Sequence, residues 1–342
     1  MNQDQFYMRR ALQLARYGLG HTGSNPMVGA VIVAPGDRII GEGWHRRYGG
    51  SHAEVNAINS VSAENQHLLA QSTIYVTLEP CSHYGKTPPC SLLIIEKGIP
   101  RIVVGTGDPF PQVAGRGIRM LREAGREVVE GVLEKECYDL NLRFMTAHKR
   151  GYPYVQLKWA QTADGFISAP AGAPRLLISN PVSTVWMHRE RVSSQAIMVG
   201  TDTVITDNPS LTSRLWPGDS PLPVTFDSPR LPEDAAILKR QHVLRMRGEN
   251  ILDFLKRLYT DYHILSLMVE GGAKTLQEFI DTALFDEIRV EINPSLQLPD
   301  NAAGGAVRAP HLPAHHSAYT LTLHSITTSK GNEILTYRKT TP

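Results

Sequence analysis

Three residues in the first part of the chain have the types and spacing of a catalytic zinc site. The segment TLEPCSHYGKTPPC contains Cys81 and Cys90, two of only three cysteines in 342 residues, and SHAE upstream contains His52. Zinc binds thiolates and imidazoles tetrahedrally, and a catalytic site leaves the fourth position to water. The ion lowers the pKa of that water to about 7, which makes hydroxide available at neutral pH. We expect Glu54, two residues after His52, to transfer protons beside the metal rather than bind it.

Two other interpretations of the cysteine pair stay open, a Cys81–Cys90 disulfide and two thiols that are merely buried. The N-terminal sequence MNQDQFYMRRALQLARYGLG has apolar residues at helical spacing and acid and amide groups at its start. It therefore predicts a first helix rather than a signal peptide. We expect a cytoplasmic protein, in which thiols stay reduced, and this argues against the disulfide.

Composition and charge exclude several classes of protein. Apolar residues make up 42% of the chain, charged residues 20%, and the net charge is +2. No Lys/Arg tract suggests a nucleic-acid partner, and no run approaches the ~18 apolar residues of a membrane span. At about 150 residues per domain, the length predicts two domains. Gly151 and Pro153 introduce a new series of strands, so we place the domains at 1–149 and 150–342.

Strands and helices alternate in the first domain, which predicts an α/β layer sandwich with a ligand site near strand ends. Ser51 is the expected N-cap of the helix that follows it, and Gly98 and Pro80 are expected to end a helix and a strand. The predicted strands are 27–35, 39–45, 72–80, 101–109 and 126–132, and the predicted helices after the first are 51–61, 90–99, 117–125 and 133–151.

The second domain is predicted to be another α/β unit. Strands are expected within 149–168, 195–205, 221–228, 263–272, 287–296, 318–326 and 333–340, helices at about 181–193, 250–260 and 274–283, and surface loops at 169–174, 213–223 and 299–316. A G-x-G-x-x-G fingerprint is absent. However, an apolar strand ends at Glu270, Gly271 and Gly272 follow, and a helix begins near Lys274. This arrangement can hold a phosphate at the helix N-terminus, although Gly-Gly between a strand and a helix is common.

The motifs of the first domain resemble a known family. The pattern H-x-E followed by P-C is typical of zinc deaminases, but here eight residues separate the two cysteines instead of two. With NPMVGAVIV, GEGWH, SHAEVNAI, LEPCSHYGKTPPC and VAGRGIRMLREAG, the chain resembles the deaminase half of the RibD family of bifunctional riboflavin-biosynthesis enzymes. The resemblance covers nearly all of residues 1–148. It implies a cytidine-deaminase-like three-layer α/β/α fold.

The same resemblance implies a substrate and its contacts. Zinc-dependent deamination would act on 2,5-diamino-6-ribosylamino-4(3H)-pyrimidinone 5′-phosphate, with Glu54 passing protons. The substrate contacts would be Asn25, His45, His83, Lys86 and Asp108. One position departs from the family, because Phe110 stands where D-P-N-P often has its Asn. Gly115 and Gly117 remain, which is consistent with backbone that closely approaches a ligand.

The second domain is similar to the reductase half of the same family through QLKWAQTADGFI, VGTDTVITDNPSLTSR and VEGGAKTLQEFI. This implies a dihydrofolate-reductase-like α/β fold and NADPH reduction of the ribosyl group to a ribityl chain, giving 5-amino-6-(5-phosphoribitylamino)uracil. Lys158 would act near the reacting carbon, and Leu177 replaces a family Trp against the cofactor. The implied substrate contacts are Arg191, Leu211, Arg214 and Glu270, and the implied cofactor contacts are Gln161, Leu177, Thr203, Asp207, Ser228, Gly272, Ala273, Lys274, Thr275, Leu276, Gln277 and Glu278.

Two alternatives to this bifunctional enzyme are considered. The second domain could bind substrate or drive dimerisation without reducing anything, leaving a deaminase only. A deaminase of nucleic-acid bases would need a basic face, and the near-neutral charge disfavours it. The expected partners are therefore a small pyrimidine ribosyl phosphate and further copies of the chain in a homo-oligomer (dimer or tetramer), with Zn²⁺ and NADPH as cofactors.

Overall fold

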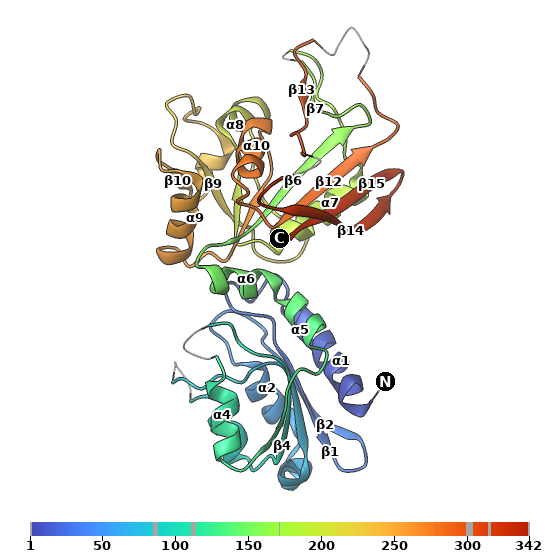
Figure 1. The fold of residues 1–342 in the computed structure, drawn as a ribbon, viewed down its shortest axis with the longest axis vertical. Helices are drawn as coiled ribbons and strands as arrows, with labels where there is room; N and C mark the ends of the chain where they lie inside the picture. The colour runs from blue at the N-terminus through green and yellow to red at the C-terminus, as the bar shows by residue number, and fades with distance from the viewer. Residues whose placement is uncertain are drawn as a thin grey trace. The chain divides into compact units, whose positions relative to one another are not determined.

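The chain folds into two compact units in a computed structural model, shown in Figure 1. The structure describes residues 2–84, 88–110, 114–170, 172–298, 304–313 and 316–340. The units are Met1–Arg150 and Gly151–Pro342, so the division lies one residue after the predicted boundary. Among the described helices, none combines the length and the apolar character that crossing a membrane requires.

The described part of the first unit contains one five-stranded sheet in the order β2-β1-β3-β4-β5. Strand β1 pairs antiparallel with both β2 and β3, whereas β3, β4 and β5 are parallel. The strands are β1 Gly29–Ala34, β2 Arg38–Trp44, β3 Thr73–Leu78, β4 Arg101–Thr106 and β5 Glu127–Val129. The helices are α1 Gln3–Ala15, α2 Ala53–Ser60, α3 Cys90–Glu96, α4 Arg116–Glu123, α5 Glu134–Leu140 and α6 Leu142–Arg150, with 3₁₀ helices at Arg16–Gly18 and Ala63–Gln71.

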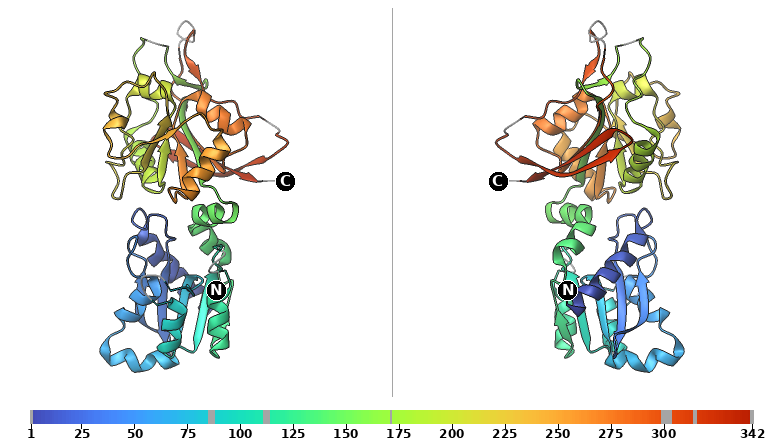
Figure 2. Two further views of the ribbon diagram at one scale, coloured as in Figure 1. Left: turned by 90° about the vertical axis from the view of Figure 1, so that its left-hand side faces the viewer. Right: turned by 90° about the vertical axis from the view of Figure 1, so that its right-hand side faces the viewer.

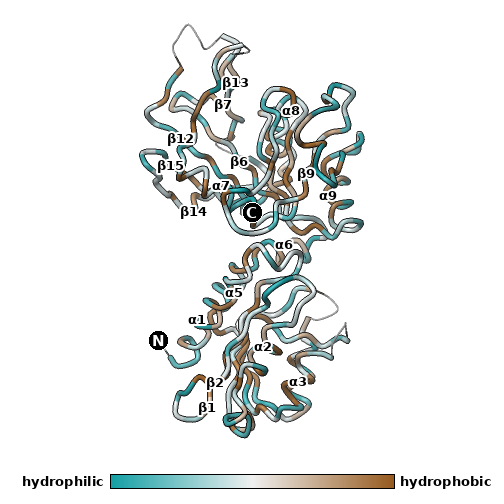
Figure 3. The backbone as a smooth tube through the Cα atoms, turned by 180° about the vertical axis from the view of Figure 1, so that it is seen from behind, coloured by the Kyte–Doolittle hydropathy of each residue, from teal (hydrophilic) through white to brown (hydrophobic). Residues whose placement is uncertain are grey.

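Helices cover both faces of this sheet, as the side views of Figure 2 show. Side chains alternate across a strand, so neighbouring residues enter different cores. Ile32 and Ile74 pack in the cluster that contains residues of α2, α3 and α4, whereas Val31 and Tyr75 pack in the cluster that contains residues of α1 and α5. Strands β1 and β3 are therefore buried on both sides, which explains their continuous apolar sequences. Strand β1 and helix α3 are among the brown, hydrophobic segments of Figure 3.

Two glycines of β2 let helix α2 lie directly on the sheet. A Cβ atom at Gly43 would lie 2.3 Å from the backbone nitrogen of Ala57, and one at Gly41 would lie 2.5 Å from the carbonyl oxygen of Ala57. This close contact fixes the start of α2, where His52 is the N-cap. The prediction of Ser51 as N-cap is therefore wrong. The Ser51 carbonyl instead accepts hydrogen bonds from Asn56 and His45.

The single helix predicted at 133–151 is wrong, because Asn141 divides it into α5 and α6. Asn141 has φ −115° and ψ 27° and is 5% exposed. Its side chain accepts from the N–H of Met27 and donates to the carbonyl of Met27, both at 2.8 Å. The break in the helix thus fixes the segment that leads into β1.

The described part of the second unit contains an eight-stranded sheet in the order β10-β9-β8-β11-β6-β12-β15-β14. The first six of these run parallel, and β15 and β14 are antiparallel to their neighbours at the edge coloured red in Figure 2. The strands are β6 Tyr154–Thr162, β7 Phe166–Ser168, β8 Ala196–Met198, β9 Leu222–Phe226, β10 Leu244–Met246, β11 Ser266–Val269, β12 Glu287–Asn293, β13 Val307–Arg308, β14 Thr320–Ser329 and β15 Asn332–Thr340. The helices are α7 Pro181–Val192, α8 Thr201–Asp207, α9 Ile251–Thr260 and α10 Ala273–Asp281, with a 3₁₀ helix at Ala236–Lys239.

Two predictions for this unit are corrected by the structure. The segment 195–205, expected as one strand, contains only the short β8, and from Thr201 it is the helix α8. The expected loop at 299–316 contains β13, which pairs with β7, while residues 299–303 and 314–315 lie outside the described part. The largest core of the unit joins β6, β11 and β12 to α9 and α10 through residues such as Leu157, Phe254 and Phe279.

Replacing Asn141 by Ala tests the division between α5 and α6. The change leaves the partly buried N–H and carbonyl of Met27 without their side-chain partner, so we expect the first unit to lose about 2 kcal/mol of unfolding free energy. Urea denaturation measures the loss. Asn59→Ala is the matched control, because Asn59 is exposed on α2. Equal transition midpoints for the two variants would contradict this role of Asn141.

Candidate functional site

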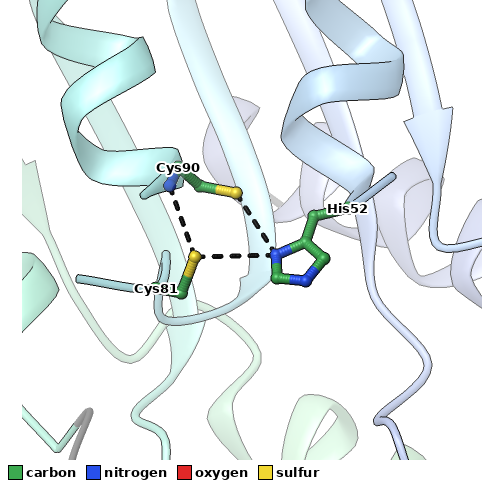
Figure 4. Close-up of side chains that lie close together, drawn as sticks. All are labelled: His52, Cys81 and Cys90. Carbon is green, nitrogen blue, oxygen red and sulfur yellow. Dashed lines mark hydrogen bonds between the residues drawn. The ribbon is translucent and has the colours of Figure 1, made fainter. Parts of the chain in front are cut away.

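The structure brings His52, Cys81 and Cys90 together, as predicted, and Figure 4 shows them facing one another. His52 Nδ1 lies 3.6 Å from Cys81 Sγ and 3.4 Å from Cys90 Sγ, and the three ligand atoms all lie within 4.8 Å of one another. The three cysteines of the chain, including Cys137, are free thiols rather than disulfides. The cluster could therefore hold a metal ion.

These distances fit one tetrahedral zinc ion. With Zn–S bonds of about 2.3 Å and a Zn–N bond of about 2.0 Å, tetrahedral angles separate the sulfur and nitrogen ligands by roughly 3.5 Å. The observed separations of 3.6 and 3.4 Å match that value. One imidazole and two thiolates are also the borderline and soft donors that zinc prefers, and they leave a fourth position for a water or substrate atom.

Helix starts and one buried serine fix the two sulfur atoms. Pro80 follows β3 and places Cys81 at the strand end, while Cys90 is the first residue of α3. The Cys90 N–H donates to Cys81 Sγ at 3.3 Å, which favours a thiolate. Ser91 donates both its N–H, at 3.2 Å, and its hydroxyl, at 2.7 Å, to the Cys81 carbonyl. The strand end and the helix start therefore form one rigid support.

The ligand groups share protons within this cluster. The hydrogen bond from the Cys90 thiol, aided by His52, lowers the pKa of Cys81 to about 4. The hydrogen bond to Cys81 raises the pKa of His52 to about 9, and the same interaction with Cys81, together with burial, raises the pKa of Cys90. Binding of a divalent cation requires two thiolates and a neutral imidazole, so it would release the remaining protons.

Glu54 lies in the first turn of α2, two residues after His52. It is 3% exposed, and burial raises the pKa of its carboxyl group, which interacts with the Cys90 thiol and the charge of His52. A carboxyl group with a raised pKa beside a metal cluster can both accept and return a proton. This geometry suits the role predicted for Glu54.

His45 and Asn25 lie beside the metal cluster and are hydrogen-bonded to each other. His45 Nδ1 is 3.1 Å from the Ser51 carbonyl, so Nδ1 carries the proton and Nε2 accepts from Asn25 Nδ2 at 3.1 Å. Burial lowers the pKa of His45, and its ring packs edge-to-face on His52 at 5.7 Å. The neutral His45 thus fixes the Asn25 amide with its nitrogen toward the imidazole.

Asp108, another predicted substrate contact, follows β4. Its Oδ1 accepts from the Phe110 N–H at 2.8 Å. Burial raises the pKa of Asp108 to about 6, and the charges of Glu79, His83 and Cys81 also affect it. His83 is exposed, and Lys86 lies outside the described residues.

Phe110, the residue that departs from the family pattern, makes an aromatic contact with α6. Its ring lies 5.2 Å from His148, which in turn lies 4.5 Å from Phe144, both with edge-to-face geometry. Phe110 therefore acts through packing and through its backbone N–H on Asp108.

One functional candidate that sequence reasoning missed is Glu79. It is 4% exposed, and its carboxylate accepts four backbone N–H groups, from Asp108, Gly115, Gly117 and Ile118. Gly117 is also required by close packing on the protein itself, because a Cβ there would lie 1.9 Å from the Pro80 carbonyl oxygen. The only sequence signal was an acidic residue directly after an apolar strand.

In the second unit, three of the predicted cofactor contacts, Gln161, Ser228 and Gly272, lie at or just after the carboxyl ends of neighbouring strands. Strands β9, β8, β11 and β6 are neighbours and parallel, so their carboxyl ends share an edge. Ser228 follows β9, Gly200 follows β8, Gly271 and Gly272 follow β11, and Gln161 is near the end of β6. This edge is where open α/β sheets bind ligands.

The Gly-Gly turn before α10 is confirmed as a strand-to-helix connection. Gly271 and Gly272 have φ +150° and +79°, and Gly272 is the N-cap of α10 without a side-chain cap bond. The Gly200 N–H donates to the Gly271 carbonyl at 3.3 Å, and a Cβ at Gly272 would lie 3.3 Å from Thr203 Oγ1. The first N–H groups of α10 are therefore suited to an anion.

The other predicted cofactor contacts differ in how accessible they are. Thr275 and Leu276 are buried, with Leu276 in the core, whereas Leu177 is 81% exposed. Gln277 bonds to both the N–H and the carbonyl of His311. Asp207 ends α8, and Ala273, Lys274 and Glu278 lie along α10 with Lys274 and Glu278 exposed.

Lys158, Arg191 and Glu270 form a charged cluster, in which Arg191 is buried and the other two are partly buried. Arg191 binds the Glu270 carboxylate through Nε at 2.9 Å and Nη2 at 2.5 Å. Burial lowers the pKa of Lys158, although the charges of Glu270 and Glu291 oppose this. Burial also acts to raise the pKa of Glu270, but Arg191 and Lys158 lower it overall. Glu291, which no sequence motif indicated, accepts hydrogen bonds from Ser179 and Asn332, both at 2.6 Å.

The Arg191 guanidinium, predicted as a substrate contact, is bound by groups of the protein itself. Its Nη1 donates to the Thr212 carbonyl at 2.8 Å while the other side of the fork holds Glu270. Leu211, with φ +52°, is 2% exposed in the same segment. Arg214 is exposed, contacts Thr212 Oγ1 at 3.4 Å, and its charge acts on His188. Arg214 is thus the more accessible cation for a phosphate.

The chain is similar to known proteins over both units. Residues 1–106 match the cytidine and deoxycytidylate deaminase zinc-binding region, and residues 153–297 match the RibD C-terminal domain. The riboflavin biosynthesis protein RibD of Aquifex aeolicus is 39% identical over 86% of this chain and 87% of its own length, and that of Actinobacillus pleuropneumoniae is 39% identical over 86% and 84%. This chain belongs to the RibD family.

Solved structures of the family agree with this result. RibD of Acinetobacter baumannii has a TM-score of 0.89 at 32% identity and covers 99% of both chains. A diaminohydroxyphosphoribosylaminopyrimidine deaminase/5-amino-6-(5-phosphoribosylamino)uracil reductase of Thermotoga maritima has a TM-score of 0.82 at 34% identity, covering 98% of this chain and 99% of that one. Both fold predictions are confirmed, and the chain is a bifunctional riboflavin-biosynthesis enzyme with a deaminase and a reductase domain. The deaminase region is of a zinc-binding family, and the reductase family implies a nucleotide cofactor.

Replacing Cys81 or Cys90 by Ala tests the metal cluster. Each change removes one of three ligands, so we expect purified variants to contain far less than the one zinc ion per chain expected for the unaltered protein. Metal content measured against protein concentration gives the result. Cys137→Ala is the matched control, because Cys137 packs against Gly105 away from the cluster. Full zinc content in the Cys81 and Cys90 variants would overturn this ligand assignment.

Proposed function

We propose that the first unit deaminates 2,5-diamino-6-ribosylamino-4(3H)-pyrimidinone 5′-phosphate with zinc, and that the second then reduces the ribosyl group with NADPH. The product would be 5-amino-6-(5-phosphoribitylamino)uracil. The assignment of deamination to residues 1–149 and reduction to residues 150–342 is part of this proposal. The observation that carries it is the zinc-sized His52–Cys81–Cys90 cluster with buried Glu54 beside it, in a chain of the RibD family.

In the deaminase unit, His52, Cys81 and Cys90 would hold the ion, and Glu54 would move protons. The ion, when bound, supplies a Lewis acid that activates water at neutral pH. Glu54 would take a proton from the attacking water and return one to the departing amine, and its buried position keeps bulk water from competing. Asn25, His45, His83, Lys86 and Asp108 would orient the pyrimidine and its phosphate.

In the reductase unit, the carboxyl edge of the sheet would hold NADPH, which supplies a hydride when bound. Two features support this, the uncapped start of α10 and the glycines that leave space there. Lys158 would donate to the sugar oxygen while hydride reaches the neighbouring carbon, because burial lowers its pKa and makes its proton easier to release. Arg191 would hold Glu270 in place, and Arg214 would bind the sugar phosphate.

A deaminase whose second unit only binds substrate or dimerises is the second candidate. Two observations favour it. Leu177 is exposed and offers no aromatic surface to a cofactor, and the Arg191 guanidinium already donates to Glu270 and to the Thr212 carbonyl. A cytoplasmic location and assembly into a dimer or tetramer stay predictions.

Replacing Glu54 by Gln tests the proposed function. The variant keeps the three ligands, so we expect it to retain zinc while ammonia release falls at least about a hundredfold. NADPH oxidation with supplied deaminated substrate should stay unchanged, because that reaction uses the other unit. Surviving ammonia release would rule out Glu54 as the proton shuttle. Absence of NADPH oxidation by the unaltered protein would instead leave the deaminase-only candidate.

Replacing Arg214 by Ala tests the phosphate site of the reductase. Loss of a charged contact to phosphate should raise the KM of reduction about tenfold with little change in kcat. Deamination should keep its KM. Arg247→Ala, at another exposed arginine of the same unit, is the control and should leave both reactions unchanged. An equal loss in both reactions would indicate misfolding rather than a phosphate contact.

A further inference from the structure

Glu79 joins two parts of the deaminase site that are far apart in sequence. It follows β3 and precedes the ligand Cys81 by two residues, and its N–H continues the pairing with β4 by donating to the Thr106 carbonyl at 2.9 Å. Its side chain reaches across to the residues that follow β4. Neither zinc binding nor the proton transfer assigned to Glu54 uses this buried carboxylate.

Each oxygen of the carboxylate accepts two backbone N–H groups. Oε2 accepts from Asp108 at 3.3 Å and from Gly115 at 2.9 Å. Oε1 accepts from Gly117 at 3.0 Å and from Ile118 at 3.4 Å. Because the last two groups belong to the first turn of α4, the positive end of that helix also stabilises the charge.

Backbone contact makes this connection rigid. A Cβ at Gly117 would lie 1.9 Å from the Pro80 carbonyl oxygen and 3.3 Å from Glu79 Oε1, so α4 starts directly against the strand end. Asp108 is held by Glu79 through its N–H, and its own carboxylate accepts from the Phe110 N–H at 2.8 Å. The position of Asp108 relative to Cys81 is therefore set through one carboxylate.

We propose that Glu79 is a positioning residue for deamination, which holds the Asp108 carboxylate at a fixed place beside the metal ligand Cys81. This inference rests on the proposed deaminase function and on Asp108 as a substrate contact. Glu79 itself accepts only backbone hydrogen bonds in this network, so it acts through Asp108 rather than on the substrate.

A double-mutant cycle tests the proposal. Glu79→Gln keeps the size of the side chain but turns one acceptor oxygen into an NH₂ group, which opposes two N–H donors. We expect zinc-loaded E79Q to raise the KM of deamination about tenfold, with a smaller change in kcat and intact reduction of supplied deaminated substrate. In a D108N background the same change should add less than about twofold, because its effect passes through Asp108.

Further variants separate positioning from stability. Glu123→Gln, at an exposed residue of α4, is the matched control and should behave as the unaltered protein. Glu79→Asp keeps the charge and should restore part of the KM. The proposal is overturned if zinc-loaded E79Q has an unchanged KM, if the effects of E79Q and D108N multiply, or if E79Q loses zinc while E79D has unaltered kinetics. Absence of ammonia release by the unaltered zinc-loaded protein would refute the proposed function instead.

Discussion

The deaminase unit depends on one geometric constraint, that an imidazole and two thiolates face a common point at tetrahedral separations. The three ligands come from the N-cap of α2, the end of β3 and the start of α3. Pro80, the glycines of β2 and the two bonds from Ser91 to Cys81 all restrict where these atoms can lie. The first N–H of α3 also donates to Cys81 Sγ, so this helix start provides positive potential where thiolate charge must form.

The two units use strand ends in the same way but neutralise charge differently. In both, polar residues follow parallel strands, as Asp108 follows β4 and Glu270 follows β11. The buried Glu79 is compensated by four backbone N–H groups, whereas the buried Glu270 is compensated by the Arg191 guanidinium. Backbone donors are fixed by the fold, while an ion pair depends on two side chains that can rearrange when substrate enters.

The sequence was sufficient for features that depend on local patterns. Continuous apolar runs predicted β1 and β3, and the combination of His52, Cys81 and Cys90 predicted the metal cluster. Features that depend on distant residues could not be predicted. The break at Asn141 depends on Met27, 114 positions away, and Glu79 depends on amides 29 to 39 positions away. Helix α8 is rich in β-branched residues, which favour strands, but the close contact of Gly200 with Thr275 Oγ1 shows that tertiary packing determines its start.

The charged cluster of the reductase unit is difficult to explain by stability alone. Lys158 lies on the central strand β6, where the charges of Glu270, Glu291 and Arg191 act on it. A buried ion pair recovers little more than the cost of removing its charges from water, and an apolar replacement is often as stable. A lysine whose pKa is lowered by burial is, in contrast, a better proton donor to a sugar oxygen than an exposed lysine. The cluster is therefore consistent with the proposed role of Lys158 in reduction. Arg191 lowers the pKa of Glu270, and in the proposed function the exposed Arg214 would be the cation that binds the phosphate.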